Sequence, residues 1–269
     1  MRDRRPHAPL RLLILGGTAE AAALARAVPE RFGARLSAIS ALAGRTEHPG
    51  PLPGEVRIGG FGGAAGLGAY LETEGIDFLI DATHPFADRI AHHARLAAES
   101  AAVPRLVLER PPWRRHPLDR WIEVETLADA AAAVERLGRR CFLTVGASDL
   151  AAFAHLRHVH FVVRLIDTPR APLPLASHEI VLGRGPFALA EEVQLLRHHR
   201  IDIVVAKASG GSATEAKLIA AREAGLPVIM LRRPKPEPGP RVDSVEQAIA
   251  WLARQIDIGV SAAAEGARS

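Results

Sequence analysis

Short glycine-rich segments that also carry hydroxyl or basic side chains recur along this chain and are its strongest candidates for chemistry. The first is Gly16-Gly17-Thr18, which follows a continuous apolar run. Glycines there let the backbone approach a phosphate, and the threonine hydroxyl can cap the next helix or bind a phosphate oxygen. Because the segment is not the GxGxxG fingerprint, a nucleotide site and an ordinary strand-to-helix turn both stay open.

The next segment, residues 40–46 at the end of the second expected strand, carries a serine, an arginine and a threonine. It contains no acidic residue, and the first one after it is Glu47. NAD-binding domains commonly place an acidic residue here for the ribose 2′-hydroxyl, whereas the 2′-phosphate of NADP needs an arginine. Ser40, Arg45 and Thr46 therefore favour NADP over NAD, with a solvated loop as the alternative.

A third segment places four glycines around one aromatic ring, Gly59-Gly60-Phe61-Gly62-Gly63. Such a segment permits close approach of the backbone to a ligand, and Phe61 is available to lie against a ring. A flexible loop is the alternative. Within this segment we count Gly60, Phe61, Gly62 and Gly63 as cofactor-binding candidates.

The fourth segment, Asp81-Ala82-Thr83-His84-Pro85-Phe86-Ala87, follows another apolar strand pattern. Proline suits the first turn of a helix, and Thr83 or His84 suits its cap. Capping does not explain an imidazole at the mouth of a sheet, so His84 is the catalytic candidate, as a hydrogen-bond or proton donor. Thr83 joins the cofactor candidates. The other eleven histidines lack metal-site spacing, and no metal site is expected.

Three loops in the second half of the chain lead into expected helix N-termini, a local geometry that binds anions. They begin at Gly146, Gly183 and Lys207. Only three of the 34 basic residues are lysines, and two of these lie in or just after the last loop. The candidates for binding a substrate are Ser148, Arg184, Lys207, Ser209, Gly210 and Lys217.

Apolar strand patterns and helix patterns alternate along the first part of the chain. The expected strands are 10–15, 34–40, 56–58, 78–82 and 105–109, and the expected helices are 19–27, 63–73 and 86–100. This alternation is typical of a doubly wound parallel sheet, in which ligands bind beyond the carboxyl ends of the strands. All the loops described above lie at such ends.

A second series follows the proline-rich segment 110–117. Its expected strands are 121–124, 141–145, 159–165, 180–182, 201–206 and 227–231, and its expected helices are 127–137, one near Leu150, 187–198, 212–224 and 245–256. The fold class is therefore α/β, with two Rossmann-like doubly wound domains, 1–115 and 116–269, and a cleft between them. We expect 234–240 to be a loop and 259–269 a frayed tail.

Composition limits the class of protein. The 269 residues are 48% hydrophobic with a formal charge of +4 and no long basic run, so we expect a soluble protein that does not bind nucleic acid. No stretch approaches the ~20 apolar residues that span a bilayer. The N-terminus is unlike a signal peptide, and the single Cys141 indicates a reducing compartment, so we expect a cytoplasmic protein. A monomer or a weak homodimer fits these features.

Together these motifs resemble the precorrin-6A reductase family of the cobalamin pathway. The likeness runs from about residue 10 to residue 255 and includes all four segments of the first domain, Lys207-x-Ser209-Gly210 and Glu215-x-Lys217. The resemblance implies direct hydride transfer from NADPH to precorrin-6A or its cobalt complex, without flavin or catalytic metal. The alternatives are an NADP-dependent reductase of a smaller anion and a non-catalytic dinucleotide-sensing protein.

The resemblance also assigns roles to the candidate residues. It implies that domain 1–115 binds NADP and that domain 116–269 binds the tetrapyrrole. It places Gly16, Gly17 and Thr18 at the pyrophosphate, Ser40, Arg45 and Thr46 at the 2′-phosphate, Gly60 to Gly63 at the cofactor's middle, Thr83 and His84 near the nicotinamide, and Ser148, Arg184, Lys207 and Ser209 at the acetate and propionate arms. The proton donor is either His84 or a bound water.

Overall fold

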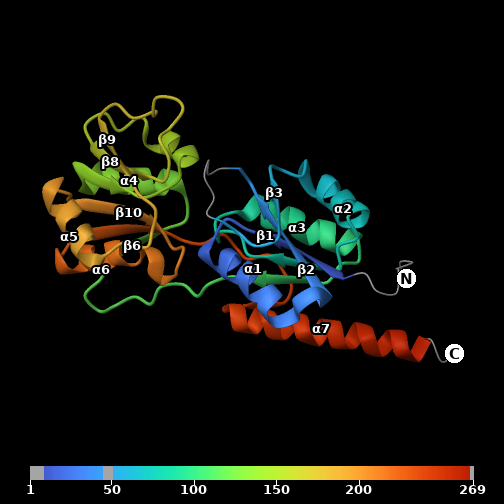
Figure 1. Cartoon of the computed structure of the whole chain (residues 1–269). Coiled ribbons are helices and arrows are strands. Elements are labelled where there is room, and N and C mark those ends of the chain that lie inside the picture. The colour runs from blue at the N-terminus through green and yellow to red at the C-terminus, as the bar shows by residue number, and fades with distance from the viewer. Residues whose placement is uncertain (1–8, 45–50, 267–269) are drawn as a thin grey trace. The chain divides into compact units, whose positions relative to one another are not determined.

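The computed structural model describes residues 9–44 and 51–266, and the chain forms two compact units (Figure 1). The first unit contains residues 1–110 and 235–269, and the second contains residues 111–234. The chain therefore leaves the first unit once and returns to it at its end.

The first unit is built on a six-stranded parallel sheet in the order β12-β5-β4-β1-β2-β3. Its strands are β1 (Leu10–Leu15), β2 (Leu36–Leu42), β3 (Glu55–Ile58), β4 (Phe78–Asp81), β5 (Arg105–Leu108) and β12 (Arg241–Val242). This is the 3-2-1-4-5-6 order of dinucleotide-binding domains, and its direction reverses between β1 and β4.

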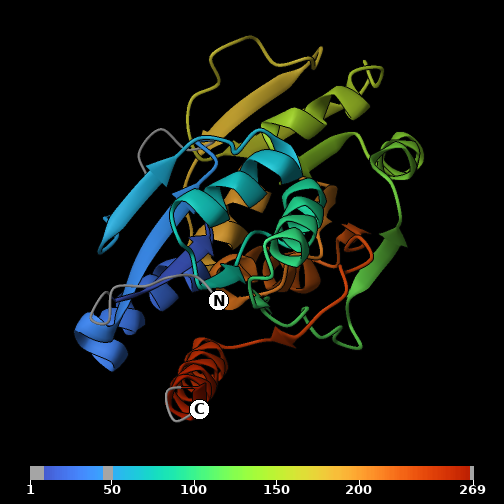
Figure 2. The same cartoon turned by 90° about the vertical axis from the view of Figure 1, so that its right-hand side faces the viewer.

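Helices cover both faces of this sheet. They are α1 (Ala19–Phe32), α2 (Gly63–Thr73), α3 (Asp88–Ser100) and α7 (Val245–Gly266), with a 3₁₀ turn η1 (Gly33–Arg35) after α1. Leu12 and Ile14 of β1 pack with residues of α1 and α7, whereas Leu13 and Leu15 pack with residues of α2 and α3. Figure 2 shows α2 and α3 side by side. Burial on both faces explains why β1 is apolar throughout most of its length.

The second unit contains another six-stranded parallel sheet, in the order β6-β11-β10-β7-β8-β9. Its strands are β6 (Arg120–Val124), β7 (Arg140–Leu143), β8 (His160–Leu165), β9 (His178–Leu182), β10 (Ile203–Lys207) and β11 (Pro227–Leu231). The chain winds outward from β7 to β9 on one side and from β10 to β11 on the other. The switch point therefore lies between β7 and β10.

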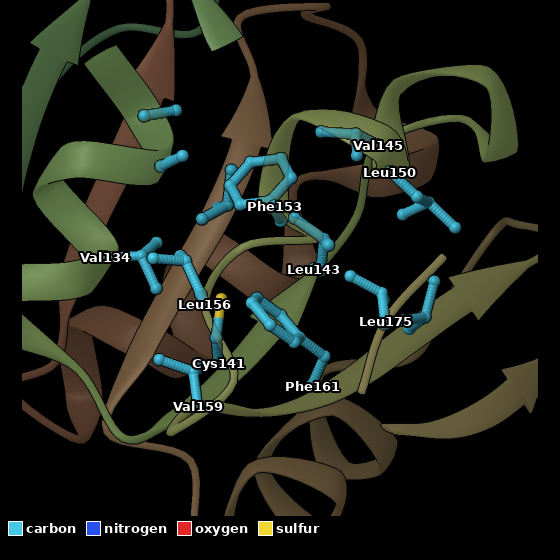
Figure 3. Close-up of a cluster of buried hydrophobic side chains, with 14 of the residues drawn as sticks. Val134, Cys141, Leu143, Val145, Leu150, Phe153, Leu156, Val159, Phe161 and Leu175 are labelled. Carbon is cyan, nitrogen blue, oxygen red and sulfur yellow. The ribbon is translucent and has the colours of Figure 1, made fainter. Parts of the chain in front are cut away.

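Helices also cover both faces of the second sheet. They are α4 (Leu127–Leu137), α5 (Leu189–His198) and α6 (Ala216–Glu223), together with the 3₁₀ segments η2 (Ala147–Phe153) and η3 (Ser212–Thr214). In the cluster beneath α4 and η2, the rings of Phe153 and Phe161 meet edge to face with centroids 5.9 Å apart (Figure 3). Cys141 lies in the same cluster, where burial raises the pKa of its thiol well above the ordinary value and keeps it unreactive.

The expected pair of doubly wound α/β sheets is confirmed, but the observed units differ from the ranges 1–115 and 116–269. Residues 235–269 belong to the first unit, because β12 pairs with β5 and because Ala248 and Leu252 of α7 pack on the first sheet. The two-residue β12 carries no recognisable pattern, and an amphipathic helix does not reveal which sheet it will cover.

Several expected boundaries also differ. The predicted tail 259–269 is wrong, since α7 continues to Gly266. The 3₁₀ turn η1 delays β2 until Leu36, and η3 delays α6 until Ala216. Among the described residues, no helix combines the length and apolar character needed to cross a bilayer.

Candidate functional site

At the switch point of the first sheet, the turn after β1 is joined to the turn after β4. The Ala82 N–H donates to the Leu15 carbonyl over 2.9 Å, and the Thr18 hydroxyl donates to the Ala82 carbonyl over 2.7 Å. The same hydroxyl accepts from the Ala21 N–H over 3.1 Å, which caps α1. Of the two roles left open for Thr18, the structure shows the cap.

The two glycines in this turn differ in their surroundings. A side chain at Gly16 would lie 3.3 Å from the Cβ of Ala21, so Gly16 permits packing against α1. Gly17 has a φ of +107°, and a Cβ there would meet no atom within 4 Å. Gly17 therefore leaves open space beside the N-terminus of α1, where a ligand's negative charge is stabilised.

The glycine segment after β3 is similarly open. A Cβ at Gly59, Gly60, Gly62 or Gly63 would meet nothing within 4 Å, and Gly62 and Gly63 have φ values of +79° and +92°. Bare backbone with this much space around it can contact a ligand that side chains would exclude.

Arg57 holds this segment in place, a role that only its position two residues before Gly59 could have suggested. Its guanidinium donates to the carbonyls of Gly59 and Gly60 over 2.7 and 2.9 Å. Its Cζ lies 3.9 Å from the centroid of the Phe61 ring, and the centroid of the Tyr70 ring lies 5.2 Å from the same centroid. Arg57 and Tyr70 thus contact the ring that was expected to lie against a ligand.

Ser40 is the one 2′-phosphate candidate in the described part of the chain. It lies two residues before the carboxyl end of β2, it is 3% exposed, and its hydroxyl has no hydrogen-bond partner. A buried hydroxyl without a partner suits a polar ligand group. Arg45 and Thr46 lie outside the described residues.

Asp81 and Thr83 shape the turn after β4. The buried Oδ1 of Asp81 accepts from the Thr83 N–H over 3.1 Å and from the Thr83 hydroxyl over 2.7 Å. Burial raises the pKa of Asp81, and the hydrogen bonds from Thr83 oppose that rise. The sequence singled out Thr83 but missed Asp81, which fixes its side chain.

His84 follows directly. Its Nδ1 accepts from the Phe86 N–H over 3.2 Å, which assigns the proton of the neutral ring to Nε2. The expectation that Thr83 or His84 caps a helix starting near 86 is wrong, because α3 starts at Asp88 and its cap is Ala87. The imidazole is held by this turn and partly exposed, with Nε2 as its donor.

At the switch point of the second sheet, Lys207 ends β10 and Asp149 follows β7. The Lys207 Nζ lies 2.5 Å from Asp149 Oδ2, and the two side chains are 20% and 19% exposed. The Ser148 hydroxyl, on an exposed residue, donates to the other oxygen of Asp149 over 3.3 Å. The structure thus brings Ser148 and Lys207 together through an aspartate whose role the sequence did not indicate.

Arg184 is exposed on the loop that follows β9, the far edge strand. This loop nevertheless reaches the segment after β10, because the Phe187 N–H donates to the Ala213 carbonyl over 3.2 Å. A Cβ at Gly185 would lie 2.8 Å from the same carbonyl. The two loops therefore contact each other.

The remaining substrate candidates are buried. Ser209 and Lys217 are each 7% exposed, and a Cβ at Gly210 would lie 2.1 Å from the Pro111 carbonyl oxygen. The Lys217 ammonium donates to the Thr214 carbonyl over 2.6 Å. These contacts of Gly210 and Lys217 lie within the second unit.

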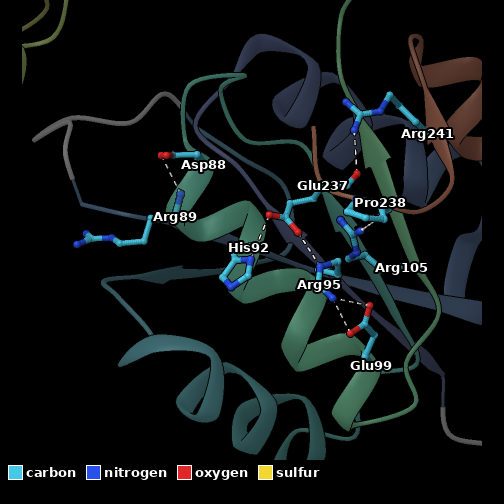
Figure 4. Close-up of polar contacts among 9 residues, drawn as sticks. All are labelled: Asp88, Arg89, His92, Arg95, Glu99, Arg105, Glu237, Pro238 and Arg241. Carbon is cyan, nitrogen blue, oxygen red and sulfur yellow. Dashed lines mark hydrogen bonds and ion pairs between the residues drawn. The ribbon is translucent and has the colours of Figure 1, made fainter. Parts of the chain in front are cut away.

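Figure 4 shows an ionic network that fastens the segment before β12 to α3 in the first unit. Glu237 accepts from Arg95 over 2.6 Å and lies 3.1 Å from His92 Nδ1, and the bond from Arg95 lowers the pKa of Glu237. Arg95 also contacts Glu99 at 2.8 Å. In the described part of the chain, no group of three or more His, Cys, Asp or Glu side chains is arranged to hold a metal.

Comparison with known proteins gives concordant matches. The family model described as precorrin-6x reductase CbiJ/CobK matches residues 11–253. A precorrin-6A reductase of Rhodococcus erythropolis is 48% identical over 90% of this chain and 97% of the relative. A cobalt-precorrin-6A reductase of Salmonella typhimurium is 30% identical over 84% of this chain and 88% of the relative. A solved structure of CobK precorrin-6A reductase is similar with a TM-score of 0.86 and 43% identity, covering 91% of this chain and 96% of that one.

Proposed function

This chain belongs to the precorrin-6x reductase CbiJ/CobK family, and from that membership we propose that it reduces precorrin-6A to its dihydro form in cobalamin biosynthesis, using NADPH. The observation that carries the proposal is 48% identity to a precorrin-6A reductase over nearly the whole of both chains. Relatives named for the cobalt-containing substrate are about 30% identical. This difference favours the metal-free macrocycle.

The first unit has features that suit NADPH. Gly17 and the glycines at 60, 62 and 63 leave backbone exposed beside open space, and the hydroxyl of Ser40 lacks a partner. We assign these residues, with Thr83, to the dinucleotide, and Ser40, Arg45 and Thr46 to its 2′-phosphate end. When bound, the reduced nicotinamide supplies a hydride to a conjugated carbon of the substrate.

His84 supplies the matching proton in this proposal. Saturating a conjugated double bond requires a proton at the carbon next to the one that receives hydride. In the resting neutral ring, the bond from the Phe86 N–H to Nδ1 places the proton on Nε2 and orients the ring. A neutral imidazole is too weak an acid to give up that proton, so Nδ1 first takes up a proton from solvent in place of the bond from Phe86, and Nε2 of the resulting imidazolium donates. The transfer leaves a neutral ring, and exchange with solvent returns its remaining proton to Nε2.

The second unit supplies side chains suited to a polycarboxylate. Lys207 and Arg184 are cationic, and Ser148 offers a hydroxyl beside Lys207. We assign these three to the acetate and propionate arms. Asp149 lies 2.5 Å from the Lys207 ammonium and orients it for a substrate carboxylate. Three other candidates are left out of this assignment because they already have contacts within the second unit. The Ser209 carbonyl accepts from Arg233, Gly210 packs on Pro111, and the Lys217 ammonium donates to the Thr214 carbonyl.

The role of Arg45 is tested by Arg45→Ala. Losing a charge-assisted bond to the 2′-phosphate should raise KM for NADPH about 10- to 100-fold. KM for NADH, which has no 2′-phosphate, should change less than about twofold. Steady-state kinetics with both cofactors measures the difference. Arg35→Ala, at an exposed arginine before β2, is the matched control. Equal effects on the two cofactors would remove Arg45 from the 2′-phosphate site.

The role of Lys207 is tested by Lys207→Ala. Loss of one ammonium-to-carboxylate contact should raise KM for precorrin-6A about tenfold or more. The Kd for NADPH, measured by titration without substrate, should stay unchanged. Lys235→Ala, at an exposed lysine, is the matched control. A collapse of NADPH binding in Lys207→Ala would show that Lys207 serves the other ligand.

A further inference from the structure

The loop that follows Lys207 is held by the two segments through which the chain enters and leaves the second unit. The loop comprises residues 208–211, and the two segments contribute Trp113 and Arg233. The contacts of Trp113 and Arg233 with this loop lie within the second unit, and neither residue has a part in the proposed chemistry.

The entering segment contacts the far end of the loop. The indole Nε1–H of Trp113 donates to the Gly211 carbonyl over 2.8 Å. Gly210 is packed so closely on Pro111 that a Cβ would lie 2.1 Å from the Pro111 carbonyl oxygen. Gly210 and Gly211 have φ values of +68° and +79°, so this backbone conformation depends on glycine and is accessible to many alternatives when unrestrained.

The leaving segment contacts the near end of the loop. Arg233 donates from Nε to the Ala208 carbonyl over 2.7 Å, and from a terminal nitrogen to the Ser209 carbonyl over 2.9 Å. The Ala208 N–H donates in turn to the Leu231 carbonyl over 2.8 Å. The Arg233 guanidinium thus fixes two successive peptide groups immediately after Lys207. A lysine at position 233 lacks the planar, forked donor group needed to make both bonds with this geometry.

Lys217 supports the entering segment. Its Nζ lies 5.0 Å from the centroid of the Trp113 ring while donating to the Thr214 carbonyl. A buried ammonium in this position attracts the face of the indole and limits its rotation. Lys217 therefore contacts the ring of Trp113. The scarcity of lysine in the sequence could not distinguish this contact from contact with a ligand.

We propose that Trp113 and Arg233 are positioning residues, which fix the loop 208–211 so that the Lys207 ammonium meets a carboxylate of the tetrapyrrole. This inference rests on the proposed function and on the role of Lys207 in it. Fixing the loop before binding avoids the entropy of ordering it when substrate arrives. Loss of either contact should therefore weaken substrate binding without touching the cofactor.

Two conservative variants with matched controls test the inference in the full-length enzyme. Trp113→Phe keeps a ring over Lys217 but removes the bond to Gly211. Its control is Trp121→Phe, because the buried Trp121 Nε1 has no partner among the described residues. Arg233→Lys keeps the charge, and its control is Arg232→Lys, at an arginine that pairs with Glu123 and Glu125 at the surface.

We expect Trp113→Phe and Arg233→Lys each to raise KM for precorrin-6A about fivefold to tenfold, with kcat and KM for NADPH within twofold of the controls. Each substitution should raise KM for precorrin-6A by a smaller factor in the Lys207→Ala background than in the wild type, because Trp113 and Arg233 both act through the Lys207 ammonium. Melting temperatures within about 2 °C of the controls would show that the units remain folded.

The outcomes separate the inference from the proposed function. If Lys207→Ala raises KM for precorrin-6A but Trp113→Phe and Arg233→Lys behave like their controls, the positioning role is overturned and the proposed function stands. The positioning role is also overturned if Trp113→Phe and Arg233→Lys raise KM for precorrin-6A by the same factor in Lys207→Ala as in the wild type. Trp113 and Arg233 would then act independently of Lys207. If Lys207→Ala itself leaves KM unchanged, both the role of Lys207 and this inference fail.

Discussion

Replacing His84 with alanine is expected to lower kcat for reduction of precorrin-6A by about 10²- to 10³-fold, the range typical for loss of a positioned general acid. The residue lies at the switch point of the first sheet, and its Nδ1 accepts the Phe86 N–H so that Nε2 carries the proton. The Kd for NADPH should change little, because the backbone of the turn is held by Asp81 and Thr83. Single-turnover rates and cofactor titrations measure the two quantities.

A control variant and chemical rescue show whether the imidazole itself matters. His155→Ala, at an exposed histidine in the second unit, should keep wild-type kcat. Added imidazole should restore part of the activity of His84→Ala and none of the activity of Lys207→Ala. A kcat for His84→Ala within about threefold of wild type would assign the proton to bound water, the other donor that the sequence left open.

Replacing Glu192 with alanine is expected to destabilise the second unit by about 3–5 kcal/mol, the cost of leaving one member of a buried ion pair alone. Glu192 on α5 is fully buried, and its Oε1 lies 2.5 Å from a terminal nitrogen of Arg164 on β8. The Arg164 guanidinium also lies 3.9 Å from the ring centroid of Phe187 and 4.8 Å from that of Phe142. Without Glu192 this cation stays among aromatic rings and loses the carboxylate that pairs with it.

Chemical denaturation measures this effect as a shift of the unfolding midpoint. Glu135→Ala, at an exposed glutamate on α4, is the matched control and should have the same unfolding midpoint as the wild type. Replacing both partners, as Arg164→Met with Glu192→Leu, should be less destabilising than Glu192→Ala because no buried charge remains. If Glu192→Ala unfolds at the same denaturant concentration as Glu135→Ala, the ion pair between Glu192 and Arg164 contributes nothing to stability.

Much of the fold could be predicted because the responsible interactions are local. Strands such as β1 and β10 are buried on both faces and appear as apolar runs, and the glycine turns mark where the strands end. What local pattern cannot reveal is which sheet a distant segment joins. The two residues of β12 and the apolar face of α7 complete the first sheet after an intervening unit of more than a hundred residues.

The candidate site was predictable to a similar extent. Open glycines such as Gly17, the hydroxyl of Ser40 and the imidazole of His84 were singled out by residue type and position. The residues that were missed act on partners distant in the chain or on backbone groups. Asp149 contacts Lys207 across the switch point of the second sheet, and Arg57 donates to two glycine carbonyls. Backbone carbonyl partners have no signature in residue type.

Reduction of precorrin-6A by NADPH can be measured by incubating the purified protein with precorrin-6A and NADPH that is deuterated at the transferable position of the nicotinamide. We expect oxidation of NADPH only in the presence of the macrocycle, a product that contains one deuterium from the cofactor and one hydrogen from solvent, and slower turnover of the cobalt complex. NADPH oxidation that does not exceed the rate without macrocycle, or a product without deuterium, would contradict the proposed function.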